Sequence, residues 1–385
     1  MRILYLALDI RLSEVTGDAI HVREATAALA ALGAEVHLVA PALDGEDRVV
    51  LDLTAKGVHV HAITAKGNLQ TALVCRKLAK ESRAEVIYER RASPKIAAAV
   101  SQATGLPFLI EVNGLIDQEV AALGKKRTPS GALKSRLRKA LFRRAAQVVA
   151  VTPGIAKALQ DQYDLSADRV TVVPNGADIE RFRPKEPASA KKALELPATR
   201  PVVGFVGTLY PWQGVEHLVA AAPEILTRAP DVRFLIVGDG SERERLQSAV
   251  KKAGLADRFQ FTGRVPYESV PGYVNASDVC VLLKDPDLYG AFTGYSPLKL
   301  YEYLACGRPI VATRTSGFEV LEEVDCGVLV NPRDPTEVSV AVVSLLHDAA
   351  RREAMGRRAR AIAVERYSWK AVAERYLTLM QKAAA

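Results

Sequence analysis

Short apolar runs alternate with helical segments along most of the chain, and this alternation restricts the fold more than any other feature of the sequence. Strands separated by helices of this length build βαβ units and a parallel sheet. The runs are almost continuously apolar, as expected when helices cover both faces of the sheet. In the first half, the predicted strands are residues 3–7, 35–40, 58–61, 85–88, 108–112, 148–151 and 170–173. Predicted helices between them include residues 19–32, 69–82 and 95–104.

The alternation is interrupted at residues 184–200, where Pro, Lys, Glu and Ala dominate and a linker is predicted. A chain of 385 residues is also long for a single core. We therefore expect two doubly wound α/β domains, 1–183 and 201–366, each with a ligand crevice at the carboxyl ends of its strands. In the second half, the predicted strands are residues 202–206, 233–237, 258–261, 279–283, 309–312 and 328–330, and the last predicted helices are residues 336–346, 351–364 and 369–382.

The composition excludes several classes of protein. Hydrophobic residues make up 49% of the chain and charged residues 25%, which is typical of a globular protein. No apolar run is long enough to span a membrane. Asp9 and Arg11 interrupt the apolar start, which favours a buried strand over a signal peptide. The four cysteines lack metal-ligand spacing, as expected for a cytoplasmic protein without a structural zinc site.

The first half lacks the usual phosphate-binding motifs. Its glycine turn after the first strand, around Gly17, does not have the G-x-G-x-x-G spacing, and the chain has no Walker A sequence. The stronger candidate is a helix within residues 294–307. Ser296 is expected as its N-cap, Pro297 as its first residue and Gly307 as its end.

The start of this helix suits an anion. The amides of Leu298 and Lys299, together with the helix dipole, favour negative charge there and would suit a diphosphate. A positive charge such as that of Lys299 destabilises the first turn of a helix, and a bound anion would explain why a lysine is found there. Glu302, one turn further on, could accept hydrogen bonds from a ribose. The alternative is an ordinary capped amphipathic helix with a solvated lysine.

With four other blocks, this segment resembles the family 4 retaining glycosyltransferases, which have the two-domain GT-B fold. The resemblance spans essentially the whole chain and keeps the order and spacing of the blocks. It implies two Rossmann-like domains that face a central cleft, an acceptor in the first, a nucleotide-sugar in the second, and a C-terminal helix, 367–385, that packs back on the first. The blocks are residues 173–184, 206–215, 237–243, 261–266 and 294–313.

The resemblance also implies roles for individual residues. Glu302 would hold the ribose, the backbone at Arg264 and Val265 would hold the base, and Gly17 would approach the diphosphate. The predicted catalytic residues are Lys299, Glu302 and His21. The predicted donor-binding residues are Gly17, Gly207, Thr208, Gln213, Gly238, Arg264, Val265, Gly294, Tyr295, Ser296, Pro297, Leu298, Lys299 and Glu302.

The sequence departs from the family at three of these positions. Gly294 stands where the family has the first of two glutamates, and the uncharged Thr208 and Gln213 stand where it has a basic pair. Two explanations follow. Either Lys299 and another base such as Arg264 hold the phosphates, which we favour, or the chain is a weak or inactive enzyme, because a buried diphosphate needs paired charge.

Acceptor candidates come from the first half. Glu89, Arg90, Glu111 and Asn113 follow or end predicted strands, where the ligands of such sheets bind. His21 lies at a helix start after the Gly17 turn and could reach the cleft, with a surface histidine as the alternative.

The expected activity is retaining, metal-independent transfer of a hexose-type sugar from a nucleotide-sugar to a hydroxyl of a glycan, glycolipid or small molecule, in bacterial polysaccharide or glycoconjugate synthesis. No cofactor, metal or nucleic acid is expected, and Asp285-Pro286-Asp287 is interpreted as a turn. The alternatives are a non-catalytic nucleotide-sugar-binding protein and a nucleotide-sugar epimerase of the same fold.

A basic segment suggests a second kind of partner. The net charge is +8, and residues 125–144 hold nine basic residues and no acidic one. Leu133, Leu137, Ala140 and Leu141 have helical spacing, so this segment could lie on an anionic membrane. We expect a cytoplasmic protein with peripheral contact to the inner face of the membrane. The alternative is a core-packed helix with a solvated basic face.

Overall fold

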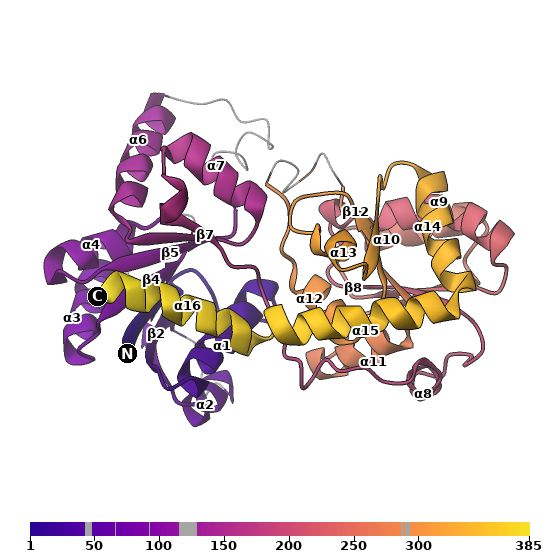
Figure 1. The fold of residues 1–385 in the computed structure, drawn as a ribbon, viewed down its shortest axis with the longest axis horizontal. Helices are drawn as coiled ribbons and strands as arrows, with labels where there is room; N and C mark the ends of the chain where they lie inside the picture. The colour runs from indigo at the N-terminus through magenta and orange to yellow at the C-terminus, as the bar shows by residue number, and fades with distance from the viewer. Residues whose placement is uncertain (43–47, 66, 92, 115–128, 286–287, 289–292) are drawn as a thin grey trace. The chain divides into compact units, whose positions relative to one another are not determined.

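The computed structural model describes residues 1–385 except 43–47, 66, 92, 115–128, 286–287, 289–292 and the side chains of 129–134. The chain forms two compact units. One comprises Met1–Asn175 and Trp369–Ala385, and the other comprises Gly176–Ser368. Each unit has its own parallel sheet with helices packed on it (Figure 1).

The first unit contains a seven-stranded parallel sheet of order β3-β2-β1-β4-β5-β6-β7. Its strands are β1 (Arg2–Leu6), β2 (Glu35–Pro41), β3 (Val58–Ile63), β4 (Val86–Arg90), β5 (Phe108–Val112), β6 (Gln147–Ala150) and β7 (Val170–Val172). Its helices are α1 (Gly17–Ala31), α2 (Arg48–Ala55), α3 (Asn68–Glu81), α4 (Lys95–Thr104), α6 (Pro129–Arg144), α7 (Pro153–Tyr163) and α16 (Trp369–Ala384), with a 3₁₀ turn η1 (Ala167–Arg169). The C-terminal helix α16 packs against α1, β4 and β5 (Figure 1).

The second unit contains a six-stranded parallel sheet of order β10-β9-β8-β11-β12-β13. Its strands are β8 (Val202–Val206), β9 (Arg233–Val237), β10 (Phe259–Gly263), β11 (Val279–Leu282), β12 (Ile310–Thr313) and β13 (Gly327–Val330). Its helices are α8 (Pro187–Ala193), α9 (Val215–Arg228), α10 (Arg243–Lys252), α11 (Val270–Ala276), α12 (Leu298–Ala305), α13 (Val320–Glu323), α14 (Pro335–His347) and α15 (Ala349–Arg366), with 3₁₀ turns η2 (Pro211–Gln213) and η3 (Tyr267–Ser269).

The prediction of two doubly wound α/β units is confirmed. Each predicted strand is present, and the central strands β1, β4, β5, β8 and β11 are buried over almost their whole length because helices cover both faces of each sheet. The strand order runs outward in both directions from β1 and β4 in the first unit and from β8 and β11 in the second. These two places are topological switch points, where the ligands of such folds bind.

The boundary between the two units differs from the predicted one at residue 183. Residues 176–200 belong to the second unit, although 184–200 was expected to be a linker. Phe182 is fully buried in the second core, and its carbonyl accepts a hydrogen bond from Arg360 at 2.9 Å. Pro187 then begins helix α8, because a proline is well tolerated in the first helical turn.

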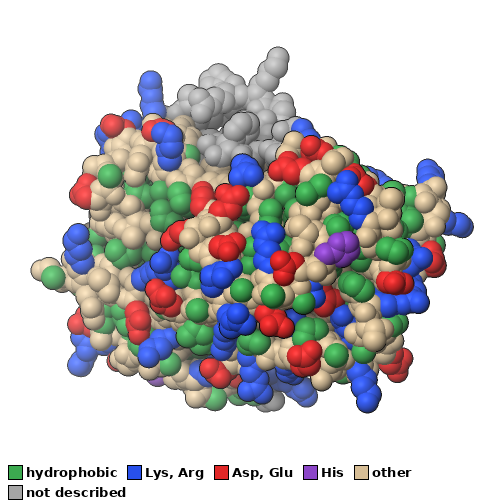
Figure 2. Space-filling view, turned by 45° about the vertical axis from the view of Figure 1, so that its right-hand side comes forward, with side chains coloured by type: hydrophobic (Ala, Val, Ile, Leu, Met, Phe, Trp, Pro, Cys, Tyr) green, Lys and Arg blue, Asp and Glu red, His purple; other side chains and the backbone are tan. Residues whose placement is uncertain are grey.

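Positive and negative side chains are mixed on the surface. Lysine and arginine side chains alternate with aspartate and glutamate on the face shown in Figure 2, without a large patch of one sign. Within the described residues, none of the helices is both long and apolar enough to cross a membrane.

Candidate functional site

The switch point of the second sheet brings together four of the predicted donor residues. Gly207 and Thr208 follow β8, and Gln213 ends the short turn η2 beyond them. Lys299 reaches the same place from the first turn of α12. These residues lie at the carboxyl ends of β8 and β11, where a ligand of such a sheet is expected.

A fifth residue, Lys284, completes the cluster and was not predicted. It lies two residues beyond the end of β11 and is only 4% exposed. The side-chain oxygen of Gln213 accepts a hydrogen bond from the Nζ of Lys284 at 2.9 Å and from the Nζ of Lys299 at 3.0 Å. The Gln213 amide nitrogen in turn lies 3.5 Å from the Thr208 hydroxyl. One neutral amide therefore holds two lysine side chains.

Each of the two lysines also lies over an aromatic ring. Lys299 lies over the ring of Phe205 at 4.3 Å, and Lys284 lies over the ring of Tyr295 at 4.8 Å. Burial lowers the pKa of Lys299 to about 7. Burial and the neighbouring charge of Lys299 hold the pKa of Lys284 well below its usual range. An anionic ligand would favour the charged forms of these two neighbouring amines.

This arrangement makes a prediction for stability. Between pH 7 and about 10.4, the unfolded chain keeps Lys299 protonated while the folded chain releases that proton, so the free energy of unfolding should rise with pH. Lys299→Met should flatten the rise in this window. A bound nucleoside diphosphate, which favours the charged lysine, should flatten it too. Melting temperatures of wild type and variant from pH 7 to 10 measure the effect, and identical profiles would contradict it.

Glycines keep the space beside the lysines open. A Cβ on Gly207 would lie 2.1 Å from the Nζ of Lys299, and a Cβ on Gly238 would lie 1.9 Å from the carbonyl oxygen of Gly207. Any larger residue at either position would displace the lysine or the loop after β8. Gly207 and Gly238, both predicted donor residues, therefore leave room for Lys299 and for the loop after β8 because they have no side chain.

The start of α12 differs from the prediction in its capping. Ser296 is not the N-cap, because its hydroxyl bonds to the hydroxyl of Tyr301 at 2.7 Å. Pro297 occupies the N-cap position in an extended conformation, and Leu298 is the first helical residue. The N–H groups of Leu298 and Lys299 still fall in the first turn, where a helix offers them no carbonyl. An anion can bind there even though the cap residue was misidentified.

The remaining donor candidates lie near the same end of the sheet. Glu302 is 6% exposed and accepts a hydrogen bond from the hydroxyl of Tyr267 at 2.8 Å. Arg264 is exposed and Val265 is half-buried, and both follow β10. Gly294 has a φ of +78°, and a Cβ there would lie 2.0 Å from the carbonyl oxygen of Ser316. The roles that the resemblance gives to these residues stay predictions.

The candidates of the first unit form a buried network around Glu111. Its carboxylate accepts hydrogen bonds from Arg90 Nε (3.1 Å) and Asn113 Nδ2 (3.2 Å), and it lies 3.2 Å from His21 Nε2. Tyr88 and Tyr376 donate to the same carboxylate at 2.8 and 3.2 Å. Although burial alone would raise it, these partners hold the pKa of Glu111 below its usual range.

His21 and Glu89 are both fully buried. His21 has no exposed surface, and its second ring nitrogen lies 2.7 Å from the side-chain oxygen of Asn175, so the alternative of a surface histidine is wrong. Glu89 points to the other face of the sheet, where it accepts the amide of Ala97 at 3.0 Å. Burial raises the pKa of Glu89 to about 7. The contact between His21 and Glu111 therefore links α1 to β5, and the bond from Tyr376 to Glu111 links α16 to the same strand. Gly17 is the exposed first residue of α1.

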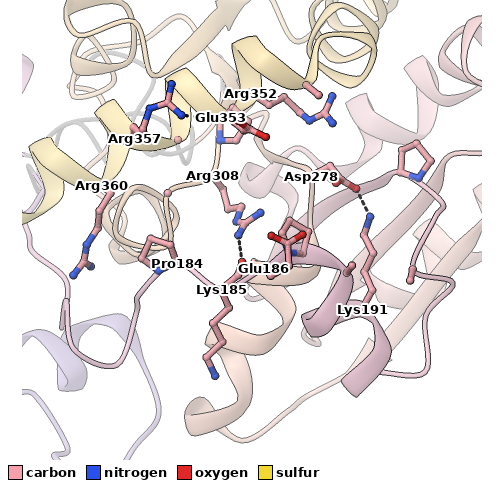
Figure 3. Close-up of a pocket in the computed structure, with 18 of the residues that line it drawn as sticks. Pro184, Lys185, Glu186, Lys191, Asp278, Arg308, Arg352, Glu353, Arg357 and Arg360 are labelled. Atoms are coloured by element: carbon pink, nitrogen blue, oxygen red, sulfur yellow. Dashed lines mark hydrogen bonds and ion pairs between the residues drawn. The ribbon is translucent and has the colours of Figure 1, made fainter.

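A cavity of about 780 Å³ in the second unit lies at the opposite end of the sheet. Its lining includes Pro201 and Asp278, which precede strands β8 and β11. Figure 3 shows two of its charged side chains bound to protein groups: Lys191 pairs with Asp278 at 2.7 Å, and Arg308 bonds to the carbonyl of Lys185. These side chains support the packing of 184–200 and are not among the predicted site residues.

The structure also bears on metal binding. Among the described residues, two groups could hold an ion: Glu35 with His37 and His59, and Glu216 with His217 and Asp285. Neither includes a predicted donor residue. Residues Pro286 and Asp287 of the predicted turn lie outside the described residues.

Comparison with known proteins points to one family. Residues 15–181 match the model described as Glycosyltransferase Family 4, and residues 200–348 match the model described as Glycosyl transferases group 1. The chain is 32% identical over 227 residues to a D-inositol 3-phosphate glycosyltransferase of Corynebacterium jeikeium, covering 56% of this chain and 52% of that protein. It is 29% identical over 364 residues to the enzyme of that name from Frankia alni, covering 86% and 87%. The match spans about half the length of several of these relatives.

Solved structures of similar fold agree. Sucrose-phosphate synthase from Thermosynechococcus elongatus superposes with a TM-score of 0.79 at 22% identity, over 99% of this chain and 98% of that one. Anabaena Alr3699/HepE in complex with UDP gives a TM-score of 0.76 at 20% identity, over 99% and 100%. These likenesses establish the GT-B fold. Because the two family models together cover most of the chain and both sheets have the Rossmann-like strand order, the chain belongs to the family 4 glycosyltransferases.

Proposed function

We propose that this enzyme transfers a hexose-type sugar, with retention of configuration and without a metal ion, from a nucleoside diphosphate sugar to a hydroxyl group. The observation that carries the proposal is the pair of lysines on Gln213 at the switch point of the second sheet. A nucleoside diphosphate would supply the negatively charged partner that neither Lys284 nor Lys299 has among the described residues. HepE, which binds UDP and UDP-glucose, has the same fold and makes a uridine nucleotide the first to test.

In this reaction the main task of the enzyme is to stabilise the leaving diphosphate. As the bond between the sugar and the diphosphate breaks, negative charge grows on the phosphate oxygens and positive charge on the sugar ring. Preorganised cations and amides stabilise the developing phosphate charge best where little water is present. Lys284, Lys299 and the first amides of α12 would do this, and Glu302 would orient the ribose. In the front-face route expected for retention, the leaving phosphate accepts the proton of the attacking hydroxyl.

Release of nucleoside diphosphate from the donor tests this proposal. The purified protein is incubated with UDP-glucose, UDP-galactose, UDP-N-acetylglucosamine, GDP-mannose and ADP-glucose, first without acceptor and then with inositol phosphate or a glycan. We expect slow hydrolysis of one donor, accelerated by an acceptor, and an α-linked product from an α-linked donor. A protein that binds a donor but releases no diphosphate would instead be the non-catalytic binding protein.

Transfer is expected to persist in excess EDTA, within about twofold of the untreated rate. The physical reason is that two ammonium groups and the helix start can stabilise the diphosphate, a task that a divalent cation has in other enzymes. The rate is measured before and after dialysis against EDTA, and again with added Mg²⁺ or Mn²⁺. Complete loss in EDTA that either ion restores would overturn metal independence.

We further propose that helix α6 contacts anionic lipid. In the structure Phe142 is buried and anchors the helix, whereas Leu137 is 54% exposed beside the exposed Arg136. Lys139 and Arg143 are partly neutralised, because both pair with Asp164. An exposed leucine next to a basic side chain suits a membrane surface.

Flotation with vesicles of anionic and of neutral lipid at low salt tests this contact. We expect binding to anionic vesicles only, with at least a fivefold loss in an Arg136→Ser, Leu137→Ser variant. The matched control is Leu73→Ser with Lys77→Ser on α3, because Leu73 is equally exposed at 54%. Equal flotation of both variants, or none of the wild type, would leave α6 as a helix with a solvated basic face.

A further inference from the structure

We propose that Lys284 is the second diphosphate-binding cation of this enzyme, and that Gln213 is the scaffold that places it beside Lys299. The inference rests on the proposed function and adds a residue to it. The family's basic pair falls on Thr208 and Gln213 in this chain, both uncharged. Lys284 restores the missing charge from a different element, the loop after β11.

The two ammonium groups share one hydrogen-bond acceptor. Each lies within 3.0 Å of the same oxygen of Gln213, so the two nitrogens are at most about 6 Å apart. That separation suits a ligand with two adjacent phosphoryl groups better than one with a single phosphate. A glutamine can hold both lysines without neutralising either, whereas a carboxylate at this place would compete with the ligand.

The charges near Lys284 leave this role open to a ligand. Within the described residues, neither Lys284 nor Lys299 forms a salt bridge. The acid next in sequence, Asp285, lies 3.3 Å from Arg333 and 3.5 Å from His217. Burial lowers the pKa of both lysines, and at Lys299 the charge of Glu302 offsets this effect only in part.

The backbone around Lys284 is held firmly. Its carbonyl accepts a hydrogen bond from the Thr313 hydroxyl at 2.7 Å. The carbonyl of Leu283 packs so closely on Gly214 that a Cβ there would lie 1.6 Å away. The loop after β11 and the turn that carries Gln213 are therefore in direct contact. Such contacts hold Lys284 in place before a ligand arrives, which reduces the ordering cost of binding.

A charge-exchange experiment tests the proposal. Lys284→Gln removes the cation, and the double variant Lys284→Gln with Gln213→Lys returns it to the position where the family carries it. Calorimetry measures the Kd of UDP, ADP and GDP and of the matching monophosphates. For the diphosphate that binds, Lys284→Gln should weaken binding about ten- to hundredfold, and the monophosphate less than about threefold. The double variant should recover most of the loss. Lys252→Gln, on the exposed end of α10, is the control and should change neither.

A second variant, Lys284→Met, distinguishes the proposed ligand-binding role of Lys284 from a purely structural one. Lys284→Met removes a buried amine whose charged form is disfavoured by burial, so we expect an equal or higher melting temperature without ligand and loss of the increase caused by the diphosphate. A lower melting temperature together with an unchanged ratio of diphosphate to monophosphate affinity would overturn the proposal, as would a Lys284→Gln variant that binds like the control. Failure of wild type to bind any of the three diphosphates would instead contradict the proposed function itself.

Discussion

Replacing Glu302 or Lys299 with alanine is expected to lower kcat/KM for the donor about ten- to hundredfold without unfolding the protein. Under the proposed function, each substitution removes a charged hydrogen bond to the donor, and such a bond typically contributes about 1.5–3 kcal/mol. Glu302 is 6% exposed and held by Tyr267, and Lys299 is held by Gln213, so both side chains are positioned before a ligand binds. The effect is measured by initial rates with the donor identified above.

The two substitutions should differ in how they act. Lys299→Ala should lower kcat more than it raises KM, because phosphate charge grows in the transition state. Glu302→Ala should mainly raise KM, since the proposed contact with the ribose would be the same in the ground state and the transition state. Lys252→Ala on the exposed end of α10 is the control. Wild-type rates in both variants would show that α12 is not the donor site.

Restoring the family's glutamate at position 294 is expected to abolish activity. Gly294 has a φ of +78°, which costs other residues about 1–2 kcal/mol, and its Cβ would lie 2.0 Å from the carbonyl oxygen of Ser316. Because that oxygen belongs to the backbone, the whole loop before α12 would have to move. We expect Gly294→Glu to reduce transfer by more than a hundredfold and to lower the melting temperature by several degrees.

The matched control for this variant is Gly272→Glu on α11. Gly272 has ordinary backbone angles, and a Cβ there meets nothing within 4 Å. It should keep near-wild-type activity and stability, apart from the modest effect of a new surface charge. If Gly294→Glu were instead as active as wild type or more so, the loop before α12 would have to adopt another conformation than the one described.

Most of the fold follows from the sequence because its strands are buried on both faces. Runs such as those at β5, β8 and β9 are predicted with their observed bounds, since a central parallel strand needs uninterrupted apolar residues. The segment 187–193 was missed as a helix because proline and charged residues usually indicate a linker. Here Pro187 occupies the first turn of α8 instead.

Local patterns in the sequence indicate only those site residues that are adjacent in the chain, whereas Gly207, Thr208 and Gln213 were predicted from the family resemblance alone. Lys299 and Glu302 lie one helical turn apart, so helical spacing indicates them. Lys284 and Gln213 meet only through the parallel pairing of β8 and β11, which no local pattern shows. A lysine directly after an apolar strand at a switch point is a signal that could have found Lys284. The burial of His21 depends in the same way on the distant Glu111 and Trp369.

The most direct test of a donor site in the second unit is a thermal-shift panel of nucleotide-sugars with their parent diphosphates and nucleosides. At a concentration a hundred times its Kd, a ligand that binds only the folded state stabilises it by about 2.7 kcal/mol, enough to raise the melting temperature by a few degrees. We predict such an increase for one nucleotide-sugar and its diphosphate, a much smaller one for the nucleoside, and the loss of both increases in Lys299→Ala. No shift with any member of the panel, or a shift that the nucleoside alone reproduces and Lys299→Ala preserves, would contradict a diphosphate-binding site at the lysine pair.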